Sequence, residues 1–435
     1  MDLKTENISR LYFKYLFPSL FSGLVMSIYS LVDMIVVGQY EGPAGTAALA
    51  CISPFWTLFC CLSVLFGNGG AVLFSAARGE NKKYESNLAF TVSFILICAA
   101  SALVWLAILF FDKPLLRLFG ADDEILPLAL QYTDWLKWGI PLWPLGYYLG
   151  MFIRNDGSPS LVGIATVCGG VFNIFGDFFL TFTCDLGMEG AAIATVAGQG
   201  IAFAIQLIHF FTRKNTISFV RVTAFLKQAR EIAVIGVSSF ICSVGMGFLI
   251  VLFNNQIMRY LGSTELAVYG VGSSLFTLIQ TFSYGIGNGA QPIVAENLGA
   301  RQWERIRQTR NWGCATAAVI GIMTMTASLL FPQDIVSLFM KSSDQMIAAA
   351  VPLLRKYFLC FLFVPFNVFA SYYLQAVKEV KASVAVSALR GFLVSGLFVY
   401  IFPPLLGADS IWFVMAAAEL ATALGAVFLI KKTAK

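Results

Sequence analysis

Apolar runs of about 20 residues recur along the whole chain and alternate with short polar segments. A helix rises about 1.5 Å per residue, so a run of this length crosses a hydrocarbon core of about 30 Å. The pattern predicts twelve membrane-spanning helices. They are placed at residues 14–38, 47–77, 88–111, 128–152, 160–182, 189–212, 230–254, 267–295, 311–331, 350–376, 382–404 and 410–430.

The composition agrees with this pattern. Of the 435 residues, 58% are hydrophobic and 12% are charged, and the mean hydropathy is +0.78. Soluble domains contain about 25% charged residues. The N-terminal segment from Met1 to Leu20 lacks a small-residue cleavage site after a short apolar core, so the first span is expected to be retained. We therefore expect an all-α integral membrane protein with no soluble domain.

Basic residues are distributed unevenly between the segments that connect the spans. Of the 29 Lys and Arg residues, 21 lie in one set of alternating segments, which includes both termini. Because Lys and Arg near span ends are enriched on the cytoplasmic side, this set is expected to be cytoplasmic. The chain is predicted to be a multi-pass protein of the inner (cytoplasmic) membrane with both termini inside.

The nine cysteines give no sign of metal or redox chemistry. Most of them lie inside predicted spans, and their spacing matches neither C-x-x-C nor a metal-ligand pattern. We interpret them as small apolar packing residues, and we predict no cofactor.

The two halves of the chain resemble each other. The sequence Gly67-Asn68-Gly69 in the second span reappears as Gly287-Asn288-Gly289 in the eighth span, and the offset from Gly67 to Gly287 also takes Gly79 to Gly299. A basic connection divides the chain into an N-terminal six-helix lobe (1–212), a cytoplasmic linker (213–229) and a C-terminal six-helix lobe (230–435). Since six is even, the repeat is parallel, with a pseudo-symmetry axis along the membrane normal. Such repeats commonly serve alternating access, which favours a transporter.

Polar residues inside the first six spans gather at one predicted depth. Asn173 and Asp177 are four residues apart and therefore share a helix face. Asp33, Asp177 and Thr195 each lie about five or six residues, roughly 7 to 9 Å, from the outer end of their span. Gln199 lies one turn deeper. An ionisable residue at membrane depth usually faces a cavity or a partner and marks a functional site.

Two carboxylates at one level in a low-dielectric site cannot both ionise at low cost. The cluster of Asp33, Asn173, Asp177 and Thr195 is thus suited to a coupling ion. This ion is a proton or Na⁺, because a hard cation takes the same carboxylate, amide and hydroxyl oxygens. The sequence leaves both ions open, and Gln199 belongs to the possible further cavity.

Other polar residues inside spans have simpler interpretations. Arg390 in the eleventh span and Glu419 in the twelfth are within reach of each other, which favours a structural ion pair over substrate contact. Both remain candidates for the further cavity. His209, near the inner end of the sixth span, is interpreted as an interfacial residue and not as a proton relay.

Several short motifs occur along the chain in a fixed order. They are Pro18 with Asp33, R-x-D-G-x-P at residues 154–159, N-x-x-x-D at Asn173 and Asp177, G-x-x-G-A-x-x-A-T from Gly187 to Thr195, and Gln291-Pro292 with Asn297, Gly299 and Ala300. In this order and spacing the chain resembles the multidrug and toxic compound extrusion (MATE) family of transporters. The resemblance covers nearly all of the sequence.

This resemblance implies a V-shaped pair of six-helix lobes that exports organic cations or other amphipathic compounds in exchange for protons or Na⁺. It assigns Asp33, Asn173, Asp177 and Thr195 to a cation site in the first lobe, and it makes Pro18 a hinge of the first helix. Some members carry acidic residues in the seventh and tenth spans, whereas here those spans offer Asn254, Asn255 and Asn367. The coupling site is therefore expected in the first lobe.

The leading hypothesis is a cation-coupled antiporter, expected to be a monomer in the lipid bilayer that handles small organic cations or amphipathic drugs and no nucleic acid. A flippase for lipid-linked precursors is the alternative, but a pyrophosphate-sugar cargo calls for several basic residues in the cavity. Arg390 is the only basic residue expected deep inside the membrane. A membrane-embedded enzyme is the remote alternative, since no clustered His, metal-spaced carboxylates or activated nucleophile is visible.

Overall fold

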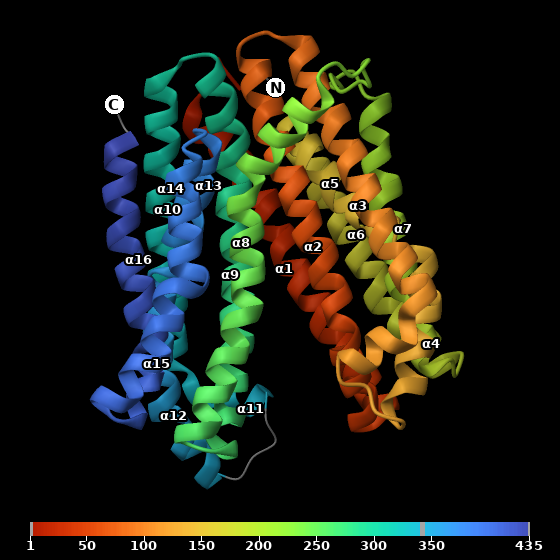
Figure 1. Cartoon of the computed structure of the whole chain (residues 1–435), viewed down its shortest axis with the longest axis vertical. Helices are drawn as coiled ribbons and strands as arrows, with labels where there is room; N and C mark the ends of the chain where they lie inside the picture. The colour runs from red at the N-terminus through yellow and green to blue at the C-terminus, as the bar shows by residue number, and fades with distance from the viewer. Residues whose placement is uncertain (1–2, 340–343, 434–435) are drawn as a thin grey trace. The chain divides into compact units, whose positions relative to one another are not determined.

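The computed structural model describes residues 3–339 and 344–433 of the chain (Figure 1). These residues form α-helices joined by short turns and by brief 3₁₀ and π segments, and the described ranges contain no strand. Within the same ranges, eleven helices are long and apolar enough to cross a membrane. The all-α membrane fold predicted from the apolar runs is confirmed.

The first half of the sequence forms seven α-helices and two short segments. They are α1 (Ile8–Tyr40), α2 (Gly42–Gly79), α3 (Lys83–Leu118), α4 (Ile125–Gly139), α5 (Leu142–Asn155), α6 (Pro159–Phe178) with the π segment η1 (Phe179–Thr183), and α7 (Gly187–Leu207) with the 3₁₀ segment η2 (Ile208–Phe211).

The second half follows a similar order. Its elements are α8 (Phe225–Tyr260), α9 (Ser263–Gly299), α10 (Trp303–Leu330), α11 (Pro332–Phe339), α12 (Asp344–Phe358), η3 (Leu359–Leu362), α13 (Val364–Ala376), α14 (Val380–Ala388), the π segment η4 (Leu389–Leu393), α15 (Val394–Leu406), η5 (Ala408–Ser410) and α16 (Ile411–Thr433).

The predicted span 128–152 is not one continuous helix, because α4 and α5 meet at Pro141. Proline has no backbone N–H, and its ring clashes with the carbonyl four residues earlier, which here is that of Lys137. That carbonyl instead accepts a hydrogen bond from Nε1 of Trp105 in α3, at 2.8 Å. The broken helix is thus tied to its neighbour by the group that the proline leaves unpaired, and neither half is long enough to count as a span.

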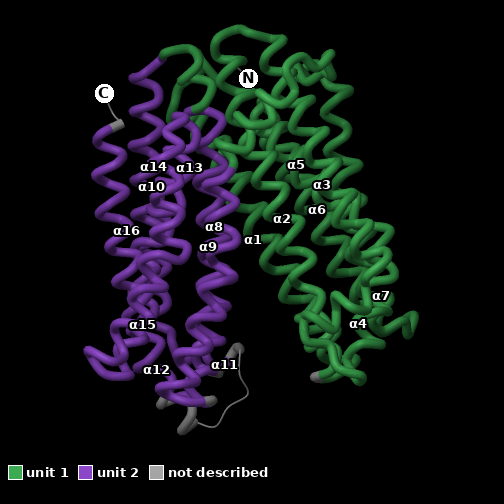
Figure 2. The backbone as a smooth tube through the Cα atoms, viewed as in Figure 1, with its two compact units in different colours: residues 1–236, 295–301 green, residues 237–294, 302–435 purple. Residues whose placement is uncertain are grey.

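The chain divides into two compact units (Figure 2). Unit 1 comprises Met1–Gly236 and Ala295–Arg301, and unit 2 comprises Val237–Val294 and Gln302–Lys435. This division differs from the predicted boundaries at 212 and 230, because the start of α8 and the end of α9 belong to unit 1. Glycines explain the attachment of α8: a Cβ built on Gly236 would lie 1.8 Å from the carbonyl oxygen of Leu65 in α2.

A second glycine contact attaches the end of α9 to α2. A Cβ on Gly79 would lie 2.0 Å from the carbonyl oxygen of Glu296, and a Cβ on Gly299 would lie 1.9 Å from that of Ala76. Gly79 and Gly299 are equivalent residues of the repeat, and Ala76 and Glu296 are separated by the same offset. The two repeats thus meet reciprocally in unit 1, and only glycine allows the backbones to approach so closely.

The repeat is also visible in the backbone itself. α3 contains one residue with non-helical dihedral angles, Phe111, at φ −128° and ψ 26°. The equivalent residue of the second half, at the same repeat offset, is Phe331, at φ −115° and ψ 40°, where α10 ends and α11 begins. The two halves therefore bend at the same place, as duplicated six-helix units should.

Substitution of Gly299 tests the α2–α9 contact. Gly299→Ala places a methyl group against a backbone carbonyl that cannot move aside, and overpacking of this kind costs about 1 to 3 kcal/mol. We expect a lower midpoint of thermal unfolding in detergent. Gly270→Ala in the same helix is the control, because its Cβ would meet nothing within 4 Å. Equal midpoints for the two variants would contradict the proposed crossing.

Candidate functional site

The polar cluster of the first half is built where α6 and α7 pack closely. A Cβ on Gly169 of α6 would lie 2.6 Å from the carbonyl oxygen of Gly198 in α7, and one on Gly198 would lie 3.1 Å from the Cβ of Asn173. Small residues let the two helix backbones approach. The polar side chains on the facing surfaces are therefore brought into direct contact.

Asn173 is the centre of the observed hydrogen bonds. Its Nδ2 donates to Oδ1 of Asp177 at 3.3 Å and to Oγ1 of Thr195 at 3.2 Å. All three residues are buried, and Asp177 has no exposed area. The predicted proximity of Asn173, Asp177 and Thr195 is therefore present in the structure.

Asp33 reaches the same cluster from α1. Its carboxylate is near enough to that of Asp177 for each to influence the charge of the other, and both lie near Tyr132. Oδ1 of Asp33, Oδ1 of Asn173 and Oδ2 of Asp177 are buried oxygens with no hydrogen-bond partner among the described residues. In the described part of the chain neither carboxylate has a basic residue within ion-pair distance. The cluster thus offers acceptor oxygens and two acidic groups that have no basic partner in the described ranges.

Two tyrosines complete this region and were missed in the sequence analysis. The hydroxyl of Tyr132 in α4 donates to Oγ1 of Thr195 at 3.2 Å. The hydroxyl of Tyr29 accepts from Nε2 of Gln199 at 3.4 Å, which brings Gln199 to the face of α1 that carries Asp33. Tyr29 precedes Asp33 by one helical turn, a spacing that could have indicated it. No pattern in the sequence singles out Tyr132.

The second half holds a different polar group in its interior. Nε of Arg390 donates to Oε1 of Glu419 at 2.8 Å, and Nδ2 of Asn367 donates to Oε2 of the same carboxylate at 2.6 Å. The side chains of Arg390 and Glu419 are each 1% exposed. The predicted pairing is present, and its two charges balance each other.

The two halves therefore do not carry two copies of one site. The repeat offset relates Gly42, which follows α1 and has a positive φ, to Gly262, which follows α8 and also has a positive φ. The same offset relates Asp33 to Phe253. Thr195 is as far along α7 from its first residue as Glu419 is along α16, so the two residues occupy equivalent positions. The acidic residue of the second half thus stands where the first half has a hydroxyl. The unbalanced acidic cluster is a feature of unit 1 alone among the residues that the structure describes.

Two further predicted residues have clear positions. α1 continues as a helix through Pro18, whose carbonyl accepts a hydrogen bond from Oγ of Ser22 at 2.8 Å. The hinge role of Pro18 stays a prediction. His209 is more than an interfacial residue, because it is fully buried and its Nε2 lies 2.8 Å from Oδ2 of Asp156.

Comparison with known proteins decides the family. The sequence profile of the MatE family matches residues 18–179 and 236–401, which is most of the chain and includes both halves of the repeat. The chain belongs to the MatE family. It is therefore a multi-pass membrane transporter and not an enzyme.

Curated relatives of this MatE protein are similar over most of its length. It is 24% identical to the multidrug export protein MepA of Staphylococcus aureus over 418 residues, covering 95% of this chain and 91% of MepA. It is 25% identical to YoeA of Bacillus subtilis, described as a probable multidrug resistance protein, over 349 residues, covering 77% of this chain and 74% of YoeA.

Solved structures confirm the fold of the MatE chain. An outward-facing MATE family transporter of the MOP superfamily matches with a TM-score of 0.90 at 20% identity, covering 99% of this chain and 97% of that chain. A MOP superfamily transporter from Pyrococcus furiosus matches with a TM-score of 0.88 at 21% identity, covering 100% and 98% of the two chains.

The buried pair of the second half makes a stability prediction. Glu419→Gln leaves the Arg390 charge buried without a counter-charge, and breaking a buried pair in this way costs about 3 to 5 kcal/mol. We expect a clearly lower thermal midpoint in detergent. Asp123→Asn is the control, because its ion pair with Arg117 is largely exposed and should contribute little. Similar shifts for the two variants would show that the buried pair is not structural.

Proposed function

We propose that this MatE transporter is a cation-coupled antiporter that exports amphipathic, often cationic, organic compounds by alternating access. The observation that supports this proposal is the acidic cluster of unit 1. Asp177 is fully buried and Asp33 is half-buried, and neither carboxyl group has a basic partner in the described residues. Such a site favours the binding of a cation from outside the protein.

The same atoms suit either of two coupling ions. A proton can bind the unpartnered oxygen of Asp33 or that of Asp177 and remove the charge that the membrane interior disfavours. Na⁺ is a hard cation and prefers oxygen ligands such as these carboxylates, with the amide oxygen of Asn173 and the hydroxyl of Thr195 nearby. Coupling ion and cationic substrate then compete for one negative charge.

The substrate class follows from charge and from relatives. An uncompensated acidic site attracts cations, and the relative MepA is named a multidrug export protein. A flippase for pyrophosphate-linked lipids is less well supported, because the buried Arg390 is already neutralised by Glu419. We therefore favour organic cations over anionic lipid cargo.

The proposed orientation rests on the basic residues. We infer that the end of unit 1 carrying Arg78, Arg154 and the segment 213–230 faces the cytoplasm, because Lys and Arg flank spans on that side. By the same reasoning both termini are cytoplasmic. The bacterial relatives support residence in the inner (cytoplasmic) membrane.

Neutralising one carboxylate tests the proposed coupling. Asp177→Asn preserves the volume and the contact with Asn173 but cannot bind or release a proton, so we expect gradient-driven export of a fluorescent organic cation to be lost. Asp33→Asn should behave alike. The measurement uses purified protein in vesicles with an imposed proton or Na⁺ gradient.

Asp123→Asn serves as the matched control, since it removes an exposed carboxylate on a loop. Circular dichroism and the elution profile should show that all three variants are folded. Undiminished gradient-driven export by either Asp33→Asn or Asp177→Asn would contradict the proposal.

A further inference from the structure

Asp156 is a buried carboxylate in unit 1 that the proposed coupling cluster does not use. It follows the last residue of α5, and Gly157 after it has a positive φ of 86°. The N–H of Gly157 donates to the carbonyl of Arg154, and the N–H of Ser158 donates to that of Ile153, which closes the helix with a glycine turn. Pro159 then begins α6. This tight turn directs the side chain of Asp156 into the protein, where it has no exposed area.

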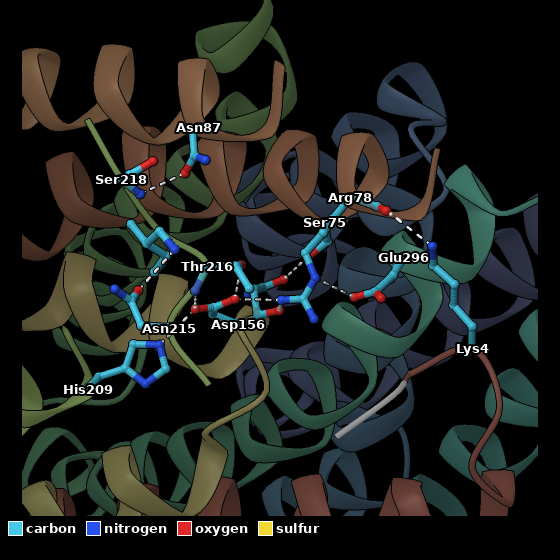
Figure 3. A network of polar contacts seen from close by, with 12 residues as sticks. Lys4, Ser75, Arg78, Asn87, Asp156, His209, Asn215, Thr216, Ser218 and Glu296 are labelled. Atoms are coloured by element: carbon cyan, nitrogen blue, oxygen red, sulfur yellow. Dashed lines mark hydrogen bonds and ion pairs between the residues drawn. The ribbon is translucent and has the colours of Figure 1, made fainter. Parts of the chain in front are cut away.

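Three parts of unit 1 converge on this one carboxylate (Figure 3). Arg78 at the end of α2 donates from Nη1 to Oδ1 at 2.7 Å, and Nε2 of His209 after α7 lies 2.8 Å from Oδ2. Thr216 donates from its backbone N–H to Oδ2 at 2.8 Å and from its hydroxyl to Oδ1. Nε of Arg78 also lies 3.4 Å from Oε2 of Glu296 at the end of α9. Asp156 therefore holds a connecting segment as well as helix ends.

The connecting segment between η2 and α8 has no helix or strand at residues 215–223, and it is fastened along α3. Its backbone N–H groups find side-chain acceptors: Ser218 donates to Oδ1 of Asn87 at 2.8 Å, and Val220 donates to Oγ1 of Thr91 at 3.2 Å (Figure 3 shows the first of these). The hydroxyl of Tyr84 donates to the carbonyl of Arg221 at 3.0 Å. Side chains of α3 thus form the hydrogen bonds with backbone groups of this segment that a neighbouring strand would form in a sheet.

Apolar contacts hold the same segment. Ile217 is 3% exposed and packs in the core of unit 1. The ring of Phe219 lies 5.2 Å from that of Phe90 and 5.1 Å from that of Phe94, centre to centre. Ala224, directly before α8, has a left-handed φ of 53°, a conformation that a residue with a side chain keeps only where its surroundings determine it.

We propose that Asp156 is a positioning residue for transport, which fastens residues 212–223 to unit 1 so that this segment acts as a fixed strap and not as a loose linker. The start of α8 up to Gly236 also belongs to unit 1. With the strap in place, the part of α8 up to Gly236 moves together with the rest of unit 1, and any hinge within α8 must lie beyond Gly236. This inference rests on the proposed transport function for its consequence, but the fastening itself can be measured without transport.

Hydrogen exchange of the strap tests the fastening directly. In Asp156→Asn the ion pair with Arg78 is lost, and we expect the amides of residues 212–223 to exchange about tenfold faster or more, as local opening becomes easier. Asn87→Ala removes the acceptor of the Ser218 amide and leaves Asp156 untouched, so it should loosen the same segment. Peptides from α6 should exchange as in the parent in both variants. Unchanged exchange of the strap in Asp156→Asn would overturn the proposal, whatever Asn87→Ala shows.

A cross-linking rescue separates positioning of the strap from a general structural effect. In a cysteine-free parent, Asn87→Cys and Ser218→Cys are joined by a short bifunctional thiol reagent, since these residues are neighbours in the structure. Asp156→Asn should lower the maximal transport rate and leave substrate affinity in place, and the cross-link should restore the rate. Asp123→Asn is the control for loss of a carboxylate.

The outcomes of the rescue are decisive. Recovery of transport on cross-linking supports the strap, and recovery of protection without recovery of transport contradicts it. If the parent itself does not transport the fluorescent cation, the exchange result still stands, and the proposed function fails separately.

Discussion

The central physical constraint on this protein is a pair of acidic side chains in unit 1 that have no basic partner among the residues that the structure describes. Asp177 is fully buried, Asp33 is half-buried, and three oxygens of the cluster have no hydrogen-bond partner among the described residues. An ionised residue at membrane depth costs about 2.5 to 3.5 kcal/mol on insertion scales, so binding of a cation or a proton would lower the free energy of this site. The second half shows the contrasting solution, because Arg390 and Glu419 neutralise each other there. The second half thus holds a closed ion pair, and the first holds an acidic site that we propose binds an ion from outside the protein.

The duplicated scaffold explains how such different interiors share one fold. Glycines at equivalent positions set the helix contacts, as Gly79 and Gly299 do between α2 and α9, and they leave the polar positions free to differ. In unit 1 the close packing of α6 on α7 brings Asn173 against Thr195. The helix scaffold therefore determines where side chains meet, and the individual residues at those places determine the chemistry.

Much of this arrangement could be predicted from the sequence, for reasons that differ between residues. Apolar runs set the spans, and ionisable residues inside them are so costly that Asp33, Asp177, Arg390 and Glu419 stood out without a structure. Tyr132 did not, because a tyrosine in a span looks like any other packing residue. The break at Pro141 was missed because prolines also lie inside continuous helices here, as Pro18 and Pro292 show. The partners of Asp156 come from distant parts of the chain, so only the tertiary structure could reveal them.

The most direct test of the central claim is a binding titration of a fluorescent organic cation against purified protein. If substrate and coupling ion share the charge of Asp33 and Asp177, binding must weaken as pH falls or as Na⁺ rises, because either ion removes the negative charge that attracts the substrate. The account predicts that this dependence disappears in the Asp33→Asn, Asp177→Asn double variant and survives in folded Glu419→Gln. A dependence that persists in the double variant but vanishes in Glu419→Gln would contradict the account and place coupling in the second half.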